Sequence, residues 1–74
     1  MLGKRIYEAR IESGKTLEEI AEEIEISYQA YRMIEKERNK PKLETLIKIA
    51  RMYNISIDYL LGFRKEKEPL YKDK

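Results

Sequence analysis

The chain contains no cysteine and no histidine, and these two absences exclude several kinds of site. Without cysteine there is no disulfide and no thiolate metal site. Without histidine there is no imidazole to ligate zinc or to activate a nucleophile. No apolar run approaches the roughly 18 residues of a membrane span, and the charged, periodic start MLGKRIYEAR is not typical of a signal peptide. We therefore expect a cytoplasmic protein that binds no metal and no cofactor.

Size and composition point to one small globular domain. The 74 residues include 42% apolar residues, ten of them isoleucine, which is enough for one compact core. A domain of this size buries only about 60% of the surface that its unfolded chain exposes, so its stability margin is thin.

The net charge of +2 hides an uneven distribution of charged residues. Residues 17–25 carry five glutamates and no basic residue. Residues 28–42 carry five basic residues against two glutamates, a surplus of three positive charges. A domain with one basic side attracts phosphates, although charge runs also occur on faces that only meet solvent.

Apolar residues at helical spacing predict five short helices and no strand. The first covers residues 2–13 and ends at Gly14, with an apolar stripe formed by Leu2, Ile6 and Ala9. The second begins after Thr16, where Thr16 and Glu19 have the spacing of a capping box. Its apolar stripe consists of Leu17, Ile20, Ala21 and Ile24.

Three further helices follow the same reasoning. Ser27 is a good N-cap for the third, whose inward side holds Tyr31 and Ile34. The polar stretch 37–42 contains a proline and is predicted as a loop. The inward side of the fourth helix is predicted to hold Leu43, Leu46, Ile47, Ala50 and Tyr53.

Capping residues also bracket the last helix. Asn54 suits a left-handed end to the fourth helix, Ser56 caps the fifth, and Gly62 ends it. We therefore place the domain at residues 1–62. Residues 63–74, which are charged and aperiodic, are predicted as a flexible tail or linker.

The second and third helices are separated by only about three residues. So short a turn makes them cross steeply instead of forming an antiparallel hairpin, and Ala21 is small where they approach. The start of the third helix then faces outward on the basic side, where a helix can enter a DNA major groove about 12 Å wide.

On these residues the chain resembles the phage-repressor (Xre/Cro-type) helix-turn-helix family. The segments that carry the resemblance are GKRIYEAR, TLEEIAEEI-EIS, YQAYRMIEK and KPKLETLIKIARMYNISIDYLLG, which together span about residues 2–62. The resemblance implies an all-α, five-helix, lambda-repressor-like bundle. It also implies binding of double-stranded operator DNA as a homodimer, without catalysis.

The resemblance assigns roles to individual positions. Base reading falls on Tyr28, Gln29, Arg32 and Met33. Phosphate binding falls on Thr16, Arg38, Asn39 and Lys40. Arg10 and Glu35 match a pair that ties the first helix to the third.

Side-chain chemistry fits these roles. The guanidinium of Arg32 matches the O6 and N7 acceptors of guanine, and the amide of Gln29 can pair with adenine. Tyr28 can pack on a thymine methyl or a sugar. The alternative for each is an ordinary solvated side chain, and Met33 also suits a half-buried filler.

Three positions depart from the family pattern. Leu17 stands where a glutamine commonly contacts the DNA backbone, and Glu25 and Glu37 replace frequent glycines. If the backbone at Glu25 still needs a positive φ, we expect strain there.

Two functions remain open, and an enzyme has little support because the carboxylates lie mostly on outer faces. The first is a repressor-like transcriptional regulator that dimerises through its last helix, where Ile55, Ile57, Tyr59, Leu61 and Phe63 form an apolar cluster. The second is a protein-interaction module, of antitoxin or adaptor type, that keeps the fold with weak DNA binding. The acidic second helix supports this alternative.

Overall fold

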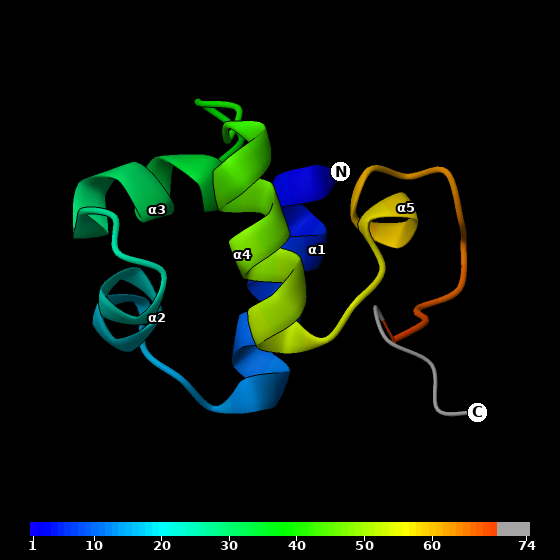
Figure 1. Cartoon of the computed structure of the whole chain (residues 1–74), viewed down its shortest axis with the longest axis horizontal. Helices are drawn as coiled ribbons and strands as arrows, with labels where there is room; N and C mark the ends of the chain where they lie inside the picture. Colours follow the sequence, from blue (N-terminus) through cyan, green and yellow to red (C-terminus); the bar gives the residue numbers. More distant parts are fainter. Residues whose placement is uncertain (70–74) are drawn as a thin grey trace.

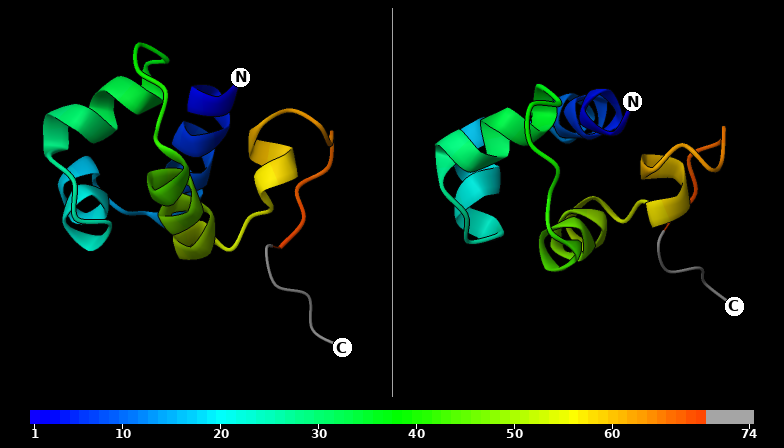
Figure 2. Two further views of the ribbon diagram at one scale, coloured as in Figure 1. Left: turned by 45° about the horizontal axis from the view of Figure 1, so that its top comes forward. Right: turned by 90° about the horizontal axis from the view of Figure 1, so that it is seen from above.

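The computed structural model describes residues 1–69, which form five helices and no strand. The helices are α1 (Leu2–Ser13), α2 (Leu17–Glu23), α3 (Tyr28–Glu35), α4 (Leu43–Tyr53) and α5 (Ile57–Leu60). α1 and α4 form the middle of the molecule, with α2 and α3 on one side and α5 on the other (Figures 1 and 2). The predicted all-helical, five-helix fold is confirmed.

A single core joins all five helices. Its largest member, Tyr31 of α3, has no exposed surface. The other buried apolar residues are Ile6, Ala9, Ile20, Ala21, Ile24, Ile34, Leu46, Ile49, Ala50, Ile55 and Leu60. Because every helix contributes to this cluster, the buried side of α3 packs on a core that all five helices share.

Capping groups set most of the helix ends, as the sequence predicts. The hydroxyls of Thr16, Ser27 and Ser56 each accept a hydrogen bond from the backbone N–H three residues on, at 3.1, 3.0 and 3.2 Å. Gly14 and Asn54 end α1 and α4 in the left-handed conformation, with φ of 74° and 51°. These local devices fix where α2 and α3 begin.

The inward face predicted for α4 is partly wrong. Leu43 is 69% exposed, whereas Ile49, which was not predicted to face inward, is fully buried. The α4 residues that pack in or on the core are Leu46, Ile49, Ala50 and, half-buried, Met52 and Tyr53; Ile47, also predicted to face inward, is half-buried and is not one of them. Both sets have helical spacing, so periodicity could not choose between them; the packing of α4 against α1 and α5 does.

The first turn of α1 packs directly on the end of α3. A Cβ atom at Gly3 would lie 2.5 Å from the carbonyl oxygen of Glu35 and 2.7 Å from that of Ile34. Only glycine allows this approach, because real Cβ contacts are longer. The close contact brings α1 under the C-terminal end of α3.

The described part of the predicted tail lies against the bundle. The carbonyl of Glu68 accepts a hydrogen bond from the backbone N–H of Ser56 at 2.7 Å, and Lys67 pairs with Glu12 of α1 at 2.6 Å. This part of the chain therefore follows α1 and the start of α5. The remainder of the predicted tail, 70–74, is outside the described residues.

Candidate nucleic-acid interface

Four residues, 24–27, connect α2 to α3. Glu25 adopts a left-handed conformation with φ of 61°, and Ile26 donates its backbone N–H to the carbonyl of Ala21 at 3.0 Å. In Figure 1, α2 is seen nearly end-on while α3 runs across the view, so the two helices cross steeply. α3 therefore lies at the edge of the molecule.

The outward side of α3 carries the four predicted base-reading residues. Tyr28 is 39% exposed and Gln29 is exposed, whereas Arg32 and Met33 are half-buried. The side chains of Gln29 and Arg32 have no hydrogen bond or ion pair with any described residue. Their donors and acceptors are thus available to a ligand that approaches this face.

A basic loop follows the C-terminal end of α3. Arg38 and Asn39 both donate their backbone N–H groups to the carbonyl of Met33, at 2.9 and 3.4 Å, and Glu37 turns the chain with φ of 60°. The side chains of Arg38, Asn39 and Lys40 are exposed and have no polar partner among residues 1–69. Three of the four predicted phosphate-binding residues are thus together in one loop.

Thr16, the fourth predicted phosphate-binding residue, stands at the start of α2. Its hydroxyl accepts the backbone N–H of Glu19, and its own backbone N–H donates to the Glu19 carboxylate at 2.9 Å. The backbone N–H of Thr16 and, to a smaller extent, its side chain hold the pKa of the Glu19 carboxylate below its usual range.

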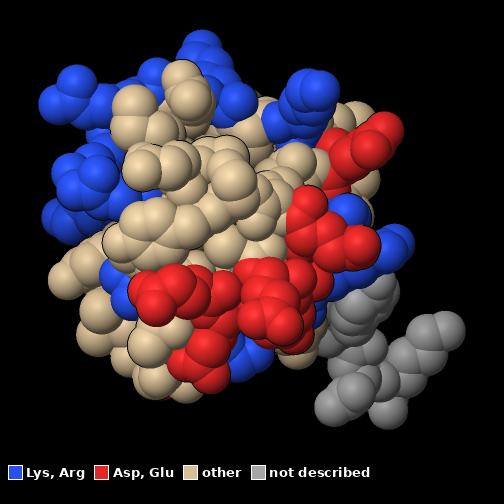
Figure 3. All heavy atoms as spheres, turned by 90° about the vertical axis from the view of Figure 1, so that its left-hand side faces the viewer, with Lys and Arg blue, Asp and Glu red and all other residues tan. Residues whose placement is uncertain are grey.

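Positive and negative charge occupy different parts of the face formed by α2 and α3. In Figure 3, Lys and Arg gather mostly along the top and upper left, and Asp and Glu form a band across the lower half. The exposed glutamates of α2 and its turn are Glu18, Glu19, Glu22, Glu23 and Glu25. The exposed basic residues after α3 are Lys36, Arg38, Lys40 and Lys42. A polyanion therefore meets attraction on the α3 side and repulsion on the α2 side.

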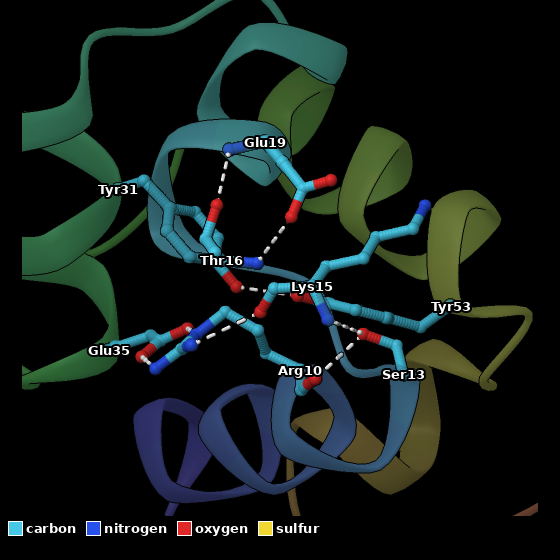
Figure 4. A network of polar contacts seen from close by, with 8 residues as sticks. All are labelled: Arg10, Ser13, Lys15, Thr16, Glu19, Tyr31, Glu35 and Tyr53. Carbon is cyan, nitrogen blue, oxygen red and sulfur yellow. Dashed lines mark hydrogen bonds and ion pairs between the residues drawn. The ribbon is translucent and has the colours of Figure 1, made fainter.

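Arg10 joins α1 to both helices of the turn motif (Figure 4). Its Nε and Nη2 atoms donate to Glu35 of α3 at 2.9 and 3.3 Å, which is the predicted pair. Its Nη1 donates to the carbonyl of Lys15, the residue before Thr16, at 3.2 Å. The hydrogen bond to Glu35 raises the pKa of Arg10, so the guanidinium stays charged. One side chain thus fixes α3 relative to the start of α2.

Sequence reasoning missed a second connection of this kind. The hydroxyls of Tyr31 and Tyr53 form a hydrogen bond of 2.8 Å between α3 and α4 (Figure 4). Burial is the main cause that raises the pKa of both phenols, that of Tyr53 to about 12. Both tyrosines occupied predicted inward positions, but only the fold shows that their hydroxyls meet.

Residues 1–69 contain no group of three His, Cys, Asp or Glu side chains placed to hold a metal ion. No helix within this part of the chain has the length and apolar character to cross a membrane.

Two helices crossing at a four-residue turn, the second with an exposed polar face beside a basic loop, define a helix-turn-helix domain. Residues 6–60 match the family model described as Helix-turn-helix. The chain belongs to this family, which is the Xre type of helix-turn-helix.

Curated relatives are regulators of transcription. The chain is 43% identical over 61 residues to the HTH-type transcriptional regulator ImmR of Bacillus subtilis, covering 82% of this chain and 48% of ImmR. It is 36% identical over 69 residues to the uncharacterized HTH-type transcriptional regulator YobD of the same organism, covering 93% and 62%. It is 34% identical to the cryptic phage CTXphi transcriptional repressor RstR of Vibrio cholerae, covering 84% and 56%. The chain thus spans about half to three-fifths of the length of these relatives.

Solved structures share the fold. The N-terminal DNA-binding domain of SinR from Bacillus subtilis superposes with a TM-score of 0.78 at 30% identity, covering 89% of this chain and 97% of that domain. A SinR–SinI complex gives a TM-score of 0.77 at 30% identity, covering 84% and 61%.

Proposed function

We propose that this domain binds double-stranded DNA as a sequence-specific, repressor-like transcriptional regulator. The observation that carries the proposal is the outward face of α3. Gln29 and Arg32 on this face have no polar partner among the described residues. The loop that follows α3 adds the exposed side chains of Arg38, Asn39 and Lys40, which also have no polar partner within residues 1–69. Named regulators and repressors among the relatives support the same function.

The chemistry divides between bases and backbone. α3 lies in the major groove, where Arg32 donates to guanine O6 and N7 and Gln29 pairs with adenine. Tyr28 packs beside them, and Met33 fills the edge of this contact. Arg38, Asn39 and Lys40 bind phosphates on one flank, and Thr16 donates its hydroxyl to a phosphate on the other. This is a binding function, and the exposed glutamates of α2 form no enclosed site for catalysis.

We further propose that the domain binds DNA as a homodimer through the end of α5. Leu61 is 43% exposed and Phe63 78% exposed, and Ile57 and Tyr59 beside them are half-buried. Ile55 does not take part, because it is 4% exposed and belongs to the core. Two such domains read half-sites about one helical turn apart, roughly 34–36 Å.

Selection from a random duplex library, followed by titration of the selected duplex and a scrambled one, tests this function. We expect the selected duplex to bind at least about a thousandfold more tightly, and affinity to fall steeply between about 50 and 200 mM salt. Equal, weak binding of both duplexes would contradict the proposal. That result would favour the protein-interaction module, which the acidic surface of α2 and Glu37 beside the basic loop also suit.

A further inference from the structure

The recognition helix α3 is attached to α4 through a single pair of hydroxyl groups. Tyr31 has no exposed surface, and its hydroxyl lies 2.8 Å from that of Tyr53. Within residues 1–69, no other side-chain hydrogen bond joins α3 to α4. A buried hydroxyl needs a partner, so this hydrogen bond fixes the Tyr31 side chain to one point on α4.

A second attachment lies one turn further along the same side of α3. Glu35, four residues after Tyr31, forms the forked pair with Arg10 of α1. Residues four apart share one side of a helix, so the two attachments act on the same face from two different helices. Together they fix both the tilt of α3 and its rotation about its own axis.

The rotation of α3 about its own axis decides which side chains its outward face presents to DNA. Gln29 and Arg32 lie on the side opposite the buried residues, and each is aimed only by the orientation of the helix, because neither has a polar partner among the described residues. A bidentate contact with a base tolerates little displacement of the donor atoms. Any interaction that fixes how α3 is rotated about its axis therefore influences which base pairs the domain distinguishes.

We propose that Tyr53 is a positioning residue for base reading, which acts through the hydroxyl of Tyr31 and touches no DNA itself. This inference rests on the proposed DNA-binding function. Without the Tyr53 hydroxyl, the remaining side-chain partner near the Tyr31 hydroxyl is the Glu35 carboxylate, which also raises the Tyr31 pKa. With or without a hydrogen bond to Glu35, the attachment of α3 to α4 is lost, and the Arg10–Glu35 pair alone fixes the orientation of α3.

Three variants separate positioning from stability. Tyr53→Phe removes one hydroxyl and leaves the Tyr31 hydroxyl without its partner on α4. The double variant Tyr31→Phe with Tyr53→Phe removes both, so no buried hydroxyl is left unpaired and stability should return close to that of the original chain. Tyr7→Phe is the matched control, because Tyr7 is 46% exposed and its hydroxyl has no hydrogen-bond partner among the described residues. Each protein is titrated with the selected and the scrambled duplex at one salt concentration, well below its unfolding temperature.

We expect Tyr53→Phe to lower the ratio of selected to scrambled affinity about tenfold, which corresponds to the loss of one base contact. The double variant should keep this low ratio despite its restored stability, and Tyr7→Phe should keep the original ratio. An unchanged ratio in Tyr53→Phe, or a ratio that recovers together with stability in the double variant, would overturn the positioning role and leave the DNA-binding function intact. An original chain that does not discriminate between the duplexes would overturn both.

Discussion

Arg10 and Glu35 form a forked ion pair between α1 and α3, in which the Nε–Oε2 distance is 2.9 Å and the Nη2–Oε1 distance is 3.3 Å. Their side chains are only 14% and 7% exposed. Since both charges are largely removed from water, each depends on the other for its solvation. Removing one partner therefore costs more stability, because it leaves an uncompensated and largely buried charge, than the attraction between the two charges contributes.

Removing one charge of this pair should destabilise the domain strongly. We expect Glu35→Gln to lower the free energy of unfolding by about 3 kcal/mol, because it leaves a nearly buried guanidinium unpaired. Urea unfolding measures the loss. The control is Glu12→Gln, since Glu12 is 65% exposed in its pair with Lys67, and this change should cost less than about 1 kcal/mol. Similar losses in the two variants would show that the Arg10–Glu35 pair behaves as a surface pair.

The close contact at Gly3 predicts that Gly3→Ala lowers the free energy of unfolding more than Gly14→Ala does. Gly3→Ala should cost about 2–3 kcal/mol, because the new methyl group meets backbone oxygens of α3 that cannot move alone. Gly14→Ala should cost about 1 kcal/mol, because φ is +74° there but no atom lies within 4 Å of the added Cβ. Thermal unfolding of both variants shows which substitution destabilises the domain more. A smaller loss at Gly3 would mean that α1 and α3 can separate at little cost.

Replacing the strained turn residue should stabilise the domain. We expect Glu25→Gly to raise the free energy of unfolding by about 0.5–1 kcal/mol, because φ is 61° and glycine adopts this conformation without steric cost. Little is lost with its carboxylate, which is 81% exposed and 3.9 Å from Lys48. Glu22→Gly, inside α2, should instead cost about 1 kcal/mol. Chemical denaturation compares the two, and a loss in both would show that the turn is unstrained.

The two buried phenols predict a loss of stability in alkali. Tyrosine in an unfolded chain has a pKa of about 10, and both folded-state values are raised, that of Tyr53 to about 12. Stability is thus fully present below about pH 10 and is lost as the pH rises toward the folded-state pKa, because only the unfolded chain releases these protons. Tyr31 alone should contribute a slope of up to about 1.4 kcal/mol per pH unit. Urea unfolding between about pH 9 and 11.5 measures it, and Tyr31→Phe should flatten the curve by this amount; an equally steep curve would contradict the assignment.

Base reading and phosphate binding should separate in Arg32→Ala and Lys40→Ala. Arg32→Ala should weaken binding of the selected duplex by about 1–3 kcal/mol and relax the preference at one base pair. Lys40→Ala should weaken selected and scrambled duplexes alike and reduce the salt slope by about one. Titrations of both variants with the selected and the scrambled duplex, at two salt concentrations, distinguish these effects. If Arg32→Ala lowers both affinities equally, Arg32 binds a phosphate; if neither variant changes binding, this surface does not contact DNA.

Local chemistry made much of the fold predictable from the sequence. Thr16, Ser27 and Ser56 cap helices through their own neighbours, and Gly14 and Asn54 end them, so their roles depend on only a few adjacent residues. The positive φ at Glu25 was suggested only by the family resemblance, through the glycine that Glu25 replaces. The Arg10–Glu35 pair was predicted only through the family resemblance.

Features that depend on distant packing were not predictable in the same way. Gly3 is an ordinary helical residue until the end of α3 lies against it. The hydroxyls of Tyr31 and Tyr53 are 22 positions apart, and periodicity places both side chains inward without saying that they meet. Leu43 was wrongly predicted to face inward because two apolar stripes of α4 share the same spacing, and only the neighbouring helices distinguish them.

The separation of charge between α2 and the loop after α3 bears on kinetics as well as on affinity. With a net charge of only +2, the domain as a whole is drawn weakly toward a polyanion. The glutamates of α2 and the basic loop nevertheless experience opposite forces near a duplex, and this couple exerts a torque on the domain. Encounters with the acidic side foremost are repelled or rotated before contact, so a larger fraction of collisions begins with α3 already facing the groove.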